Sequence, residues 1–110
     1  MKHTELLRWP RVLILQLKRW EGVSQYLLFV LRKNPVRIHF ETVLPVSPDV
    51  PPFHLRAVVV HHGDAGGGHY TSYVRPSNNL WYHCNDCLSP RQCTVEEVLN
   101  AEAYMLFYDQ

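Results

Sequence analysis

Runs of apolar residues and turn residues divide the chain into short strands. Residues 11–20 read RVLILQLKRW and begin directly after Pro10, so this aliphatic stretch predicts a central strand. Residues 26–31 are apolar throughout, and so short a run does not distinguish a strand from a buried helix. The same patterns predict further strands at residues 36–40, 53–61, 70–74, 80–84 and 103–108.

Turn and cap residues set the connections between these strands. The prolines between residues 45 and 52 predict a stiff, irregular connection, and the sequence PSNN at 76–79 predicts a hairpin turn. Thr94 followed by Glu97 forms the T-x-x-E capping box, which predicts a helix over residues 95–100. We therefore expect an α+β fold, a mostly antiparallel β-layer with one short helix.

Charge and composition exclude several classes of protein. The 110 residues carry 11 Lys and Arg against 10 Asp and Glu, and neither sign forms a long block, which argues against nucleic-acid and membrane-surface binding. The apolar runs are far shorter than the ~18 residues that indicate a membrane span, and no cleavable signal pattern opens the chain. Three cysteines crowded between residues 84 and 93 make a poor disulfide framework. We expect a reducing compartment, the cytoplasm or the nucleus.

The stretch GGGHYTSYV at 66–74 carries the candidate chemistry. Glycine permits positive φ and lets another backbone approach closely, and the histidine that follows, His69, lies where a strand begins. A histidine in that place can act as a general base if a partner fixes its ring. Asn85 and Asp86, at the end of the neighbouring strand, are candidate partners. The alternative is a structural or surface histidine beside an ordinary hairpin loop.

Three stretches together resemble one known family. They are WPRVLILQLKRW, AVVVHHGDAGGGHYTSYVRPSNNLWYHCND and EAYMLFYDQ, and they look like the C-terminal part of a ubiquitin-specific protease, a papain-like cysteine protease that removes ubiquitin from proteins. With the intervening segments the resemblance covers nearly the whole chain. It implies the histidine-bearing β part of the papain-like fold, with residues 1–110 forming a single partial domain.

The resemblance also implies the roles of particular residues. His69 matches the catalytic histidine of the family, Asn85 matches the third member of the triad, and Asp86 matches the acidic residue beside it. The implied partners are ubiquitin or ubiquitinated proteins, with no cofactor and no metal. The implied substrate-binding residues border the tunnel for the diglycine tail of ubiquitin: Gly66, Gly67, Gly68 and Tyr70.

The chain departs from the family pattern at the nucleophile. The family places its cysteine in a G-x-x-C box far upstream of the histidine, and nothing like that box occurs in this sequence. Cys84 could substitute, since a thiolate beside protonated His69 would have a lowered pKa, but no helix N-terminus stands behind it. A zinc site at His83-Cys84-x-x-Cys87 with Cys93 is a second alternative. Ordinary buried or half-exposed thiols are the third.

Two classes of function follow from these observations. In the first, the chain is the histidine-bearing portion of a deubiquitinating cysteine protease, completed by a complementary N-terminal catalytic half. In the second, it is a catalytically inactive truncated or isoform product that binds ubiquitin or partner proteins, because an uncovered β-layer exposes apolar surface.

Overall fold

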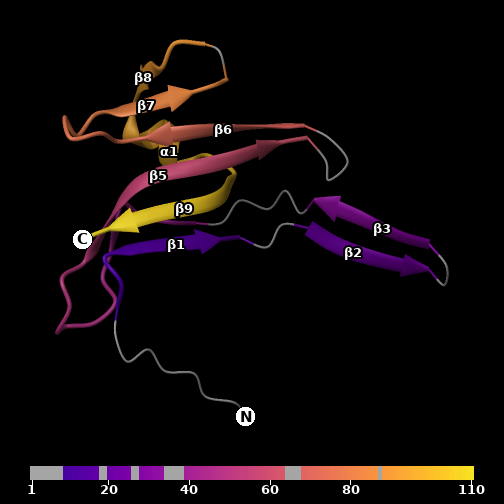
Figure 1. The fold of residues 1–110 in the computed structure, drawn as a ribbon, viewed down its shortest axis with the longest axis horizontal. Coiled ribbons are helices and arrows are strands. Elements are labelled where there is room, and N and C mark those ends of the chain that lie inside the picture. Colours follow the sequence, from indigo (N-terminus) through magenta and orange to yellow (C-terminus); the bar gives the residue numbers. More distant parts are fainter. Residues whose placement is uncertain (1–8, 18–19, 26–27, 34–38, 64–67, 87) are drawn as a thin grey trace.

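The computed structural model describes residues 9–17, 20–25, 28–33, 39–63, 68–86 and 88–110, which form nine strands and one helix (Figure 1). In chain order they are β1 (Val12–Gln16), β2 (Trp20–Gln25), β3 (Leu28–Lys33), β4 (Val43–Leu44), β5 (Phe53–His62), β6 (His69–Val74), β7 (Trp81–Cys84), β8 (Arg91–Cys93), α1 (Val95–Leu99) and β9 (Ala103–Asp109). In this described part no helix is long and apolar enough to cross a membrane.

One antiparallel sheet organises the molecule. Its strand order is β1-β9-β5-β6-β7-β8, with the short strand β4 added to β5. The last strand of the chain, β9, lies between β1 and β5, so the first and last strands of the sequence are neighbours in the sheet, with β1 at its edge. Strands β2 and β3 form a separate two-stranded sheet beyond the end of the main sheet (Figure 1).

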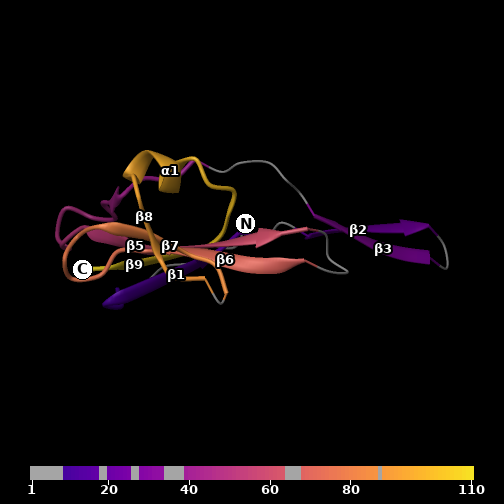
Figure 2. The same cartoon turned by 90° about the horizontal axis from the view of Figure 1, so that it is seen from above.

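The core lies on one face of the main sheet, which α1 and the segment before β5 cover (Figure 2). Along β5 the fully buried residues are Phe53, Leu55 and Val58, so the buried positions change from odd to even numbers. A register shift against β9 between Leu55 and Ala57 explains this change, because a bulge reverses the alternation of side chains. Val98 of α1 is fully buried against this face.

The helix is capped at its first turn as predicted, but only half of the capping box forms. The Thr94 hydroxyl accepts a hydrogen bond from the Glu97 N–H at 3.2 Å. The Glu97 carboxylate does not reach back to the cap, because it accepts hydrogen bonds from Arg91 at 2.7 Å and from the Tyr73 hydroxyl at 3.2 Å. The helix ends at Leu99, with Asn100 as its C-cap.

Most of the predicted elements are confirmed, within one or two residues. Residues 28–31 of the ambiguous stretch belong to strand β3, and the prolines between 45 and 52 lie in an irregular connection. The PSNN turn closes with a hydrogen bond from the Asn79 N–H to the Pro76 carbonyl at 3.0 Å.

Two strand predictions were wrong. The stretch at 11–20 does not form one central strand, because β1 ends at Gln16 and pairs only with β9 at an edge of the sheet. We expected an aliphatic strand to be buried on both faces of the sheet, but most residues of β1 are exposed. Residues 39 and 40 are not in a strand, and residues 36–38 lie outside the described part of the chain.

Candidate active site

Strands β5 and β6 pair up to the segment that carries the glycines, with His62 opposite His69. Gly68 has φ +109°, and a Cβ there would come within 1.8 Å of the His62 carbonyl oxygen. Both uses predicted for glycine, positive φ and close approach of another backbone, are therefore present at Gly68. Gly66 and Gly67 lie outside the described residues.

His69 is the first residue of β6, and its side chain is exposed. Its ring stacks on that of His62, the last residue of β5, with ring centroids 5.0 Å apart and an interplanar angle of 23°. The His62 Nε2 atom lies 2.8 Å from the Thr71 hydroxyl oxygen. The hairpin thus presents an accessible imidazole at the end of the sheet, with a second imidazole held against it.

Asn85 and Asp86 follow the end of β7. The paired part of β6 and β7 stops at Ser72 and Cys84, so Asn85 comes directly after the ladder, and its carbonyl accepts from the Leu88 N–H at 3.0 Å. Asp86 turns the chain with φ +45°. Among the described residues no hydrogen bond joins His69 to Asn85 or Asp86. Their partnership remains a prediction.

Register nevertheless relates Asn85 to the histidine. One further step of antiparallel pairing beyond Ser72 and Cys84 sets Asn85 opposite Thr71. Because Thr71 is two residues from His69, the two side chains leave β6 on the same face of the sheet. Asn85 is therefore a diagonal neighbour of His69 in sheet position.

Tyr70 lies on the other face of β6, away from the histidine. Its ring is 49% exposed and makes an edge contact with buried His61, with centroids 4.7 Å apart. A second ring, that of Tyr104 in β9, lies 5.8 Å away. Tyr70 thus belongs to an aromatic group on the face opposite α1, and a substrate-binding role for it stays a prediction.

The described cysteines are half-buried and free. Cys84 pairs with Ser72 in the sheet, and Cys93 pairs with Trp81. Burial, with the nearby Glu97 carboxylate, raises the pKa of the Cys93 thiol, so its surroundings disfavour the thiolate that a nucleophile requires. In the described part of the chain no three His, Cys, Asp or Glu side chains are grouped as a metal site. Cys87 lies outside that part, so the zinc alternative stays a hypothesis.

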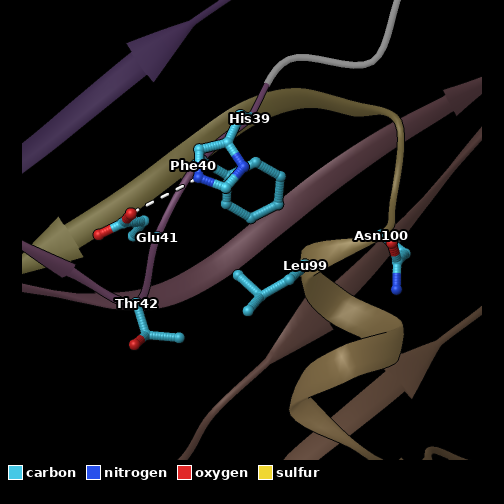
Figure 3. A pocket seen from close by; sticks show the side chains of 6 residues that line it. All are labelled: His39, Phe40, Glu41, Thr42, Leu99 and Asn100. Atoms are coloured by element: carbon cyan, nitrogen blue, oxygen red, sulfur yellow. Dashed lines mark ion pairs between the residues drawn. The ribbon is translucent and has the colours of Figure 1, made fainter.

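A pocket of about 520 Å³ lies away from these residues, between the segment before β4 and the end of α1 (Figure 3). Its lining includes Phe40, Leu99 and Asn100. His39 and Glu41 form an ion pair there at 3.5 Å, with both side chains well exposed. None of the predicted site residues lines this pocket, so it adds nothing to the candidate chemistry.

Sequence reasoning missed His62 and Thr71. The doublet His61-His62 before the glycine loop was the available signal, but the sequence did not reveal that the two histidines differ completely in surroundings. His61 is 6% exposed, whereas His62 is exposed and contacts His69. The bulge that separates Val59 from Val60 in pairing with β9 lies just before them and depends on the tertiary fold.

Comparison with known proteins places the whole chain in one group. The family model described as ubiquitin carboxyl-terminal hydrolase matches residues 2–108. Ubiquitin carboxyl-terminal hydrolase 44-A of Xenopus laevis is 38% identical over 125 residues, which cover 99% of this chain and 17% of that protein. Ubiquitin carboxyl-terminal hydrolase 44 of Danio rerio is 40% identical over 117 residues, covering 92% of this chain and 16% of its own length. The chain therefore spans about a sixth of these relatives.

Solved structures agree with the sequence relatives. The yeast SAGA DUB module superposes with a TM-score of 0.79 at 36% identity, over 91% of this chain and 23% of the matched chain. The SAGA DUB module of Ubp8, Sgf11, Sus1 and Sgf73 bound to monoubiquitin gives a TM-score of 0.76 at 37% identity, over 91% and 23% of the two chains. The mostly antiparallel sheet with one short helix is thus the fold of the corresponding part of these enzymes.

Proposed function

Because the chain belongs to the ubiquitin carboxyl-terminal hydrolase family, we propose that it supplies the base-bearing part of a deubiquitinating thiol protease. The reaction is hydrolysis of the isopeptide bond at the C-terminus of ubiquitin. The observation that carries the proposal is the exposed His69 at the first position of β6, within a segment that matches the family almost throughout. The thiol comes from a complementary N-terminal catalytic half.

In this proposal His69 moves one proton back and forth. The ring accepts the thiol proton, and the thiolate attacks the carbonyl carbon of the isopeptide bond. His69 then donates that proton to the lysine nitrogen as the isopeptide bond breaks, and the ubiquitin C-terminus remains on the sulfur as a thioester. Water attacks the thioester as His69 takes a proton from it, and returning that proton to the sulfur regenerates the thiol. The substrate and one water molecule are converted to free ubiquitin and free amine, and the protein ends unchanged.

Asn85 has the role of orienting the base. Its side-chain oxygen can accept the ring N–H of His69 and so fix the tautomer, and Asp86 assists from the next position. The sheet position of Asn85, diagonal to His69 on the same face, supports this assignment. We expect the hydrogen bond to form in the assembly with the complementary half.

The glycine loop has the role of admitting the substrate tail. A diglycine needs room for two backbones side by side, and residues without Cβ atoms leave that room. We assign Gly66, Gly67 and Gly68 to this border, with Tyr70 next to them. The positive φ of Gly63 and Gly68 supports a loop built for close approach.

Substitution of His69 tests the proposal. In an assembly of this chain with the complementary half, His69→Ala should lower turnover of a fluorogenic C-terminal ubiquitin amide by at least about 100-fold. The free energy of unfolding should stay unchanged, because the side chain is exposed. His54→Ala, another exposed histidine on β5, is the matched control and should retain turnover. Retained turnover in His69→Ala would remove His69 from the mechanism.

The exposed edge of the sheet favours a second candidate, a non-catalytic module that binds ubiquitin or another protein. Val12 and Ile14 of β1 are 54% and 52% exposed, and an apolar edge strand is a surface suited to association. Turnover in the assembly with the complementary half separates the two candidates. Mass spectrometry of this chain alone, mixed with ubiquitin that carries a cysteine-reactive C-terminus, tests whether the chain forms an active site without that half. An adduct on Cys84, Cys87 or Cys93 would contradict the need for a separate nucleophile.

A further inference from the structure

The candidate base has an aromatic neighbour that the proposed mechanism does not use. His62 ends β5 and His69 begins β6, and the two residues are paired across the hairpin. Their side chains leave the sheet on the same face, since paired residues in antiparallel strands share a face. The rings stack with centroids 5.0 Å apart and planes 23° from parallel.

His62 is itself anchored to the buried part of the sheet. Its Nε2 atom lies 2.8 Å from the hydroxyl oxygen of Thr71, and Thr71 is only 4% exposed. Thr71 pairs with Val60, which is 6% exposed and belongs to the core. A line of contacts thus runs from the core through Thr71 and His62 to the exposed ring of His69.

We propose that His62 is a positioning residue for His69, holding the ring of the general base at a fixed angle through their stacked contact. The inference rests on the proposed function, in which His69 is the base. An exposed histidine at a strand end samples several rotamers, and fixing one of them before the substrate arrives removes that entropy cost from the reaction. The Thr71 hydroxyl supplies the second point of attachment that keeps the His62 ring from rotating.

The proposed role depends on the flat face of the His62 ring and not on its nitrogens alone. Phenylalanine can stack on His69 in the same way, because offset aromatic rings attract each other through their faces and edges. Alanine removes the stack. Thr71→Val removes the hydroxyl that holds His62 while keeping the shape of a branched side chain at this buried position. These three substitutions separate the stack from its anchor.

Nuclear magnetic resonance of the full chain tests the ring contact without any turnover. In the wild type we expect a nuclear Overhauser effect between the His62 and His69 rings, and a ring-current displacement of the His69 ring resonances. In His62→Ala these resonances should move to the position of an unstacked, exposed histidine, for which His54 is the internal reference. His62→Phe and Thr71→Val both lose the contact between position 62 and the Thr71 hydroxyl but keep a ring at position 62, so in both variants the displacement should shrink without vanishing.

The outcomes are decisive in both directions. The amide spectrum reports whether each variant is folded, and His54→Ala should leave the His69 resonances in place. Unchanged His69 ring resonances in folded His62→Ala would overturn the inference. If His62→Ala does not fold, the His69 ring resonances of the other two variants test the inference. Unchanged resonances in Thr71→Val, or a complete loss of the displacement in His62→Phe, would overturn the inference.

Turnover in the assembly with the complementary half separates this inference from the proposed function. His62→Ala should lower kcat about tenfold with little change in KM, because it misaligns the base and leaves substrate binding intact. His62→Phe should recover part of this loss, because it keeps the stacked ring but not the contact with Thr71. If His69→Ala retains turnover, the proposed function fails even where the ring contact is real. If His69→Ala abolishes turnover and His62→Ala leaves kcat unchanged, the positioning role fails alone.

Discussion

Gly68 is the residue at which the backbone of the candidate site is most tightly constrained. It follows the loop, has φ +109°, and lies against the carbonyl of His62. L-residues rarely adopt such a φ, and any Cβ at this place would overlap the carbonyl oxygen. Gly68 therefore determines how closely the last residue of β5 and the first residue of β6 approach each other, and with it the contact between the two histidines.

We predict that Gly68→Ala destabilises the protein by about 2 kcal/mol or more, because backbone strain and the overlap with His62 act together. Urea unfolding followed by circular dichroism measures this loss. Ser89→Ala, at an exposed position outside the hairpin, is the control and should stay within about 0.5 kcal/mol of the wild type. Equal stabilities of Gly68→Ala and the wild type would contradict the close approach.

At the scale of elements, one polar group joins two strands to the helix. Glu97 of α1 accepts from Arg91 of β8 at 2.7 Å and from Tyr73 of β6 at 3.2 Å. Burial, with the adjacent Glu97 charge, raises the pKa of Tyr73 to about 12. The hydrogen bond from Arg91 lowers the pKa of Glu97 below its ordinary value of 4.5. The helix is therefore attached to the sheet through groups whose stabilising effect depends on pH.

Tyr73 gives the clearest pH dependence. Its pKa is about 12 in the folded chain, against about 10 in the unfolded chain. The unfolded state therefore loses the proton first, and the stability contributed by neutral Tyr73 is complete below about pH 10 and is lost as the pH rises toward 12. Between about pH 10 and pH 12 the free energy of unfolding should fall less in Tyr73→Phe than in the wild type, by about 1 to 2 kcal/mol.

Denaturant unfolding at a series of alkaline pH values measures this difference. Tyr82→Phe is the matched control, because Tyr82 lies in the neighbouring strand and its hydroxyl contacts only the Asn78 side chain among the described residues. This variant keeps Tyr73 and should lose stability as the wild type does. Parallel curves for Tyr73→Phe and the wild type would contradict the assignment.

At the scale of the whole molecule, the described part of the chain covers the main sheet on one face only. Helix α1 and the core lie on one side (Figure 2). On the other side the register sets Ile14, Phe107, Ala57 and Val74 in one row across four strands, and each of these apolar side chains is half-buried or exposed. An uncovered apolar row that reaches the β1 edge favours association with another protein surface.

We therefore predict that the isolated chain associates with itself and that Ile14→Lys weakens this association. Ile14 is 52% exposed, so the substitution should change the free energy of unfolding by less than about 0.5 kcal/mol. Sedimentation velocity at increasing protein concentration measures the association. Leu88→Lys, at a 68% exposed position off the sheet, is the control and should associate as the wild type does. A monomeric wild type at all concentrations would contradict the prediction.

Local signals in the sequence determined the elements that local chemistry controls. Val95–Leu99 is helical because Thr94 caps it, residues 76–79 turn as PSNN predicts, and the runs at 53–61 and 103–108 became strands. The glycines before His69 predicted positive φ and close approach of another backbone, and Gly68 has both. These features depend on neighbours along the chain, so the chain alone specifies them.

Tertiary structure decided the features that depend on distant residues. Strand β1, which comes from the aliphatic run at 11–20, lies at an edge because β9, almost ninety residues later, occupies the inner position beside β5. The His62 ring reaches His69 and Thr71 because bulges in β5 and the pairing of two strands fix which side chains share a face. Composition and periodicity describe each strand separately, whereas sheet edges, shared faces and ring contacts arise only when strands are paired.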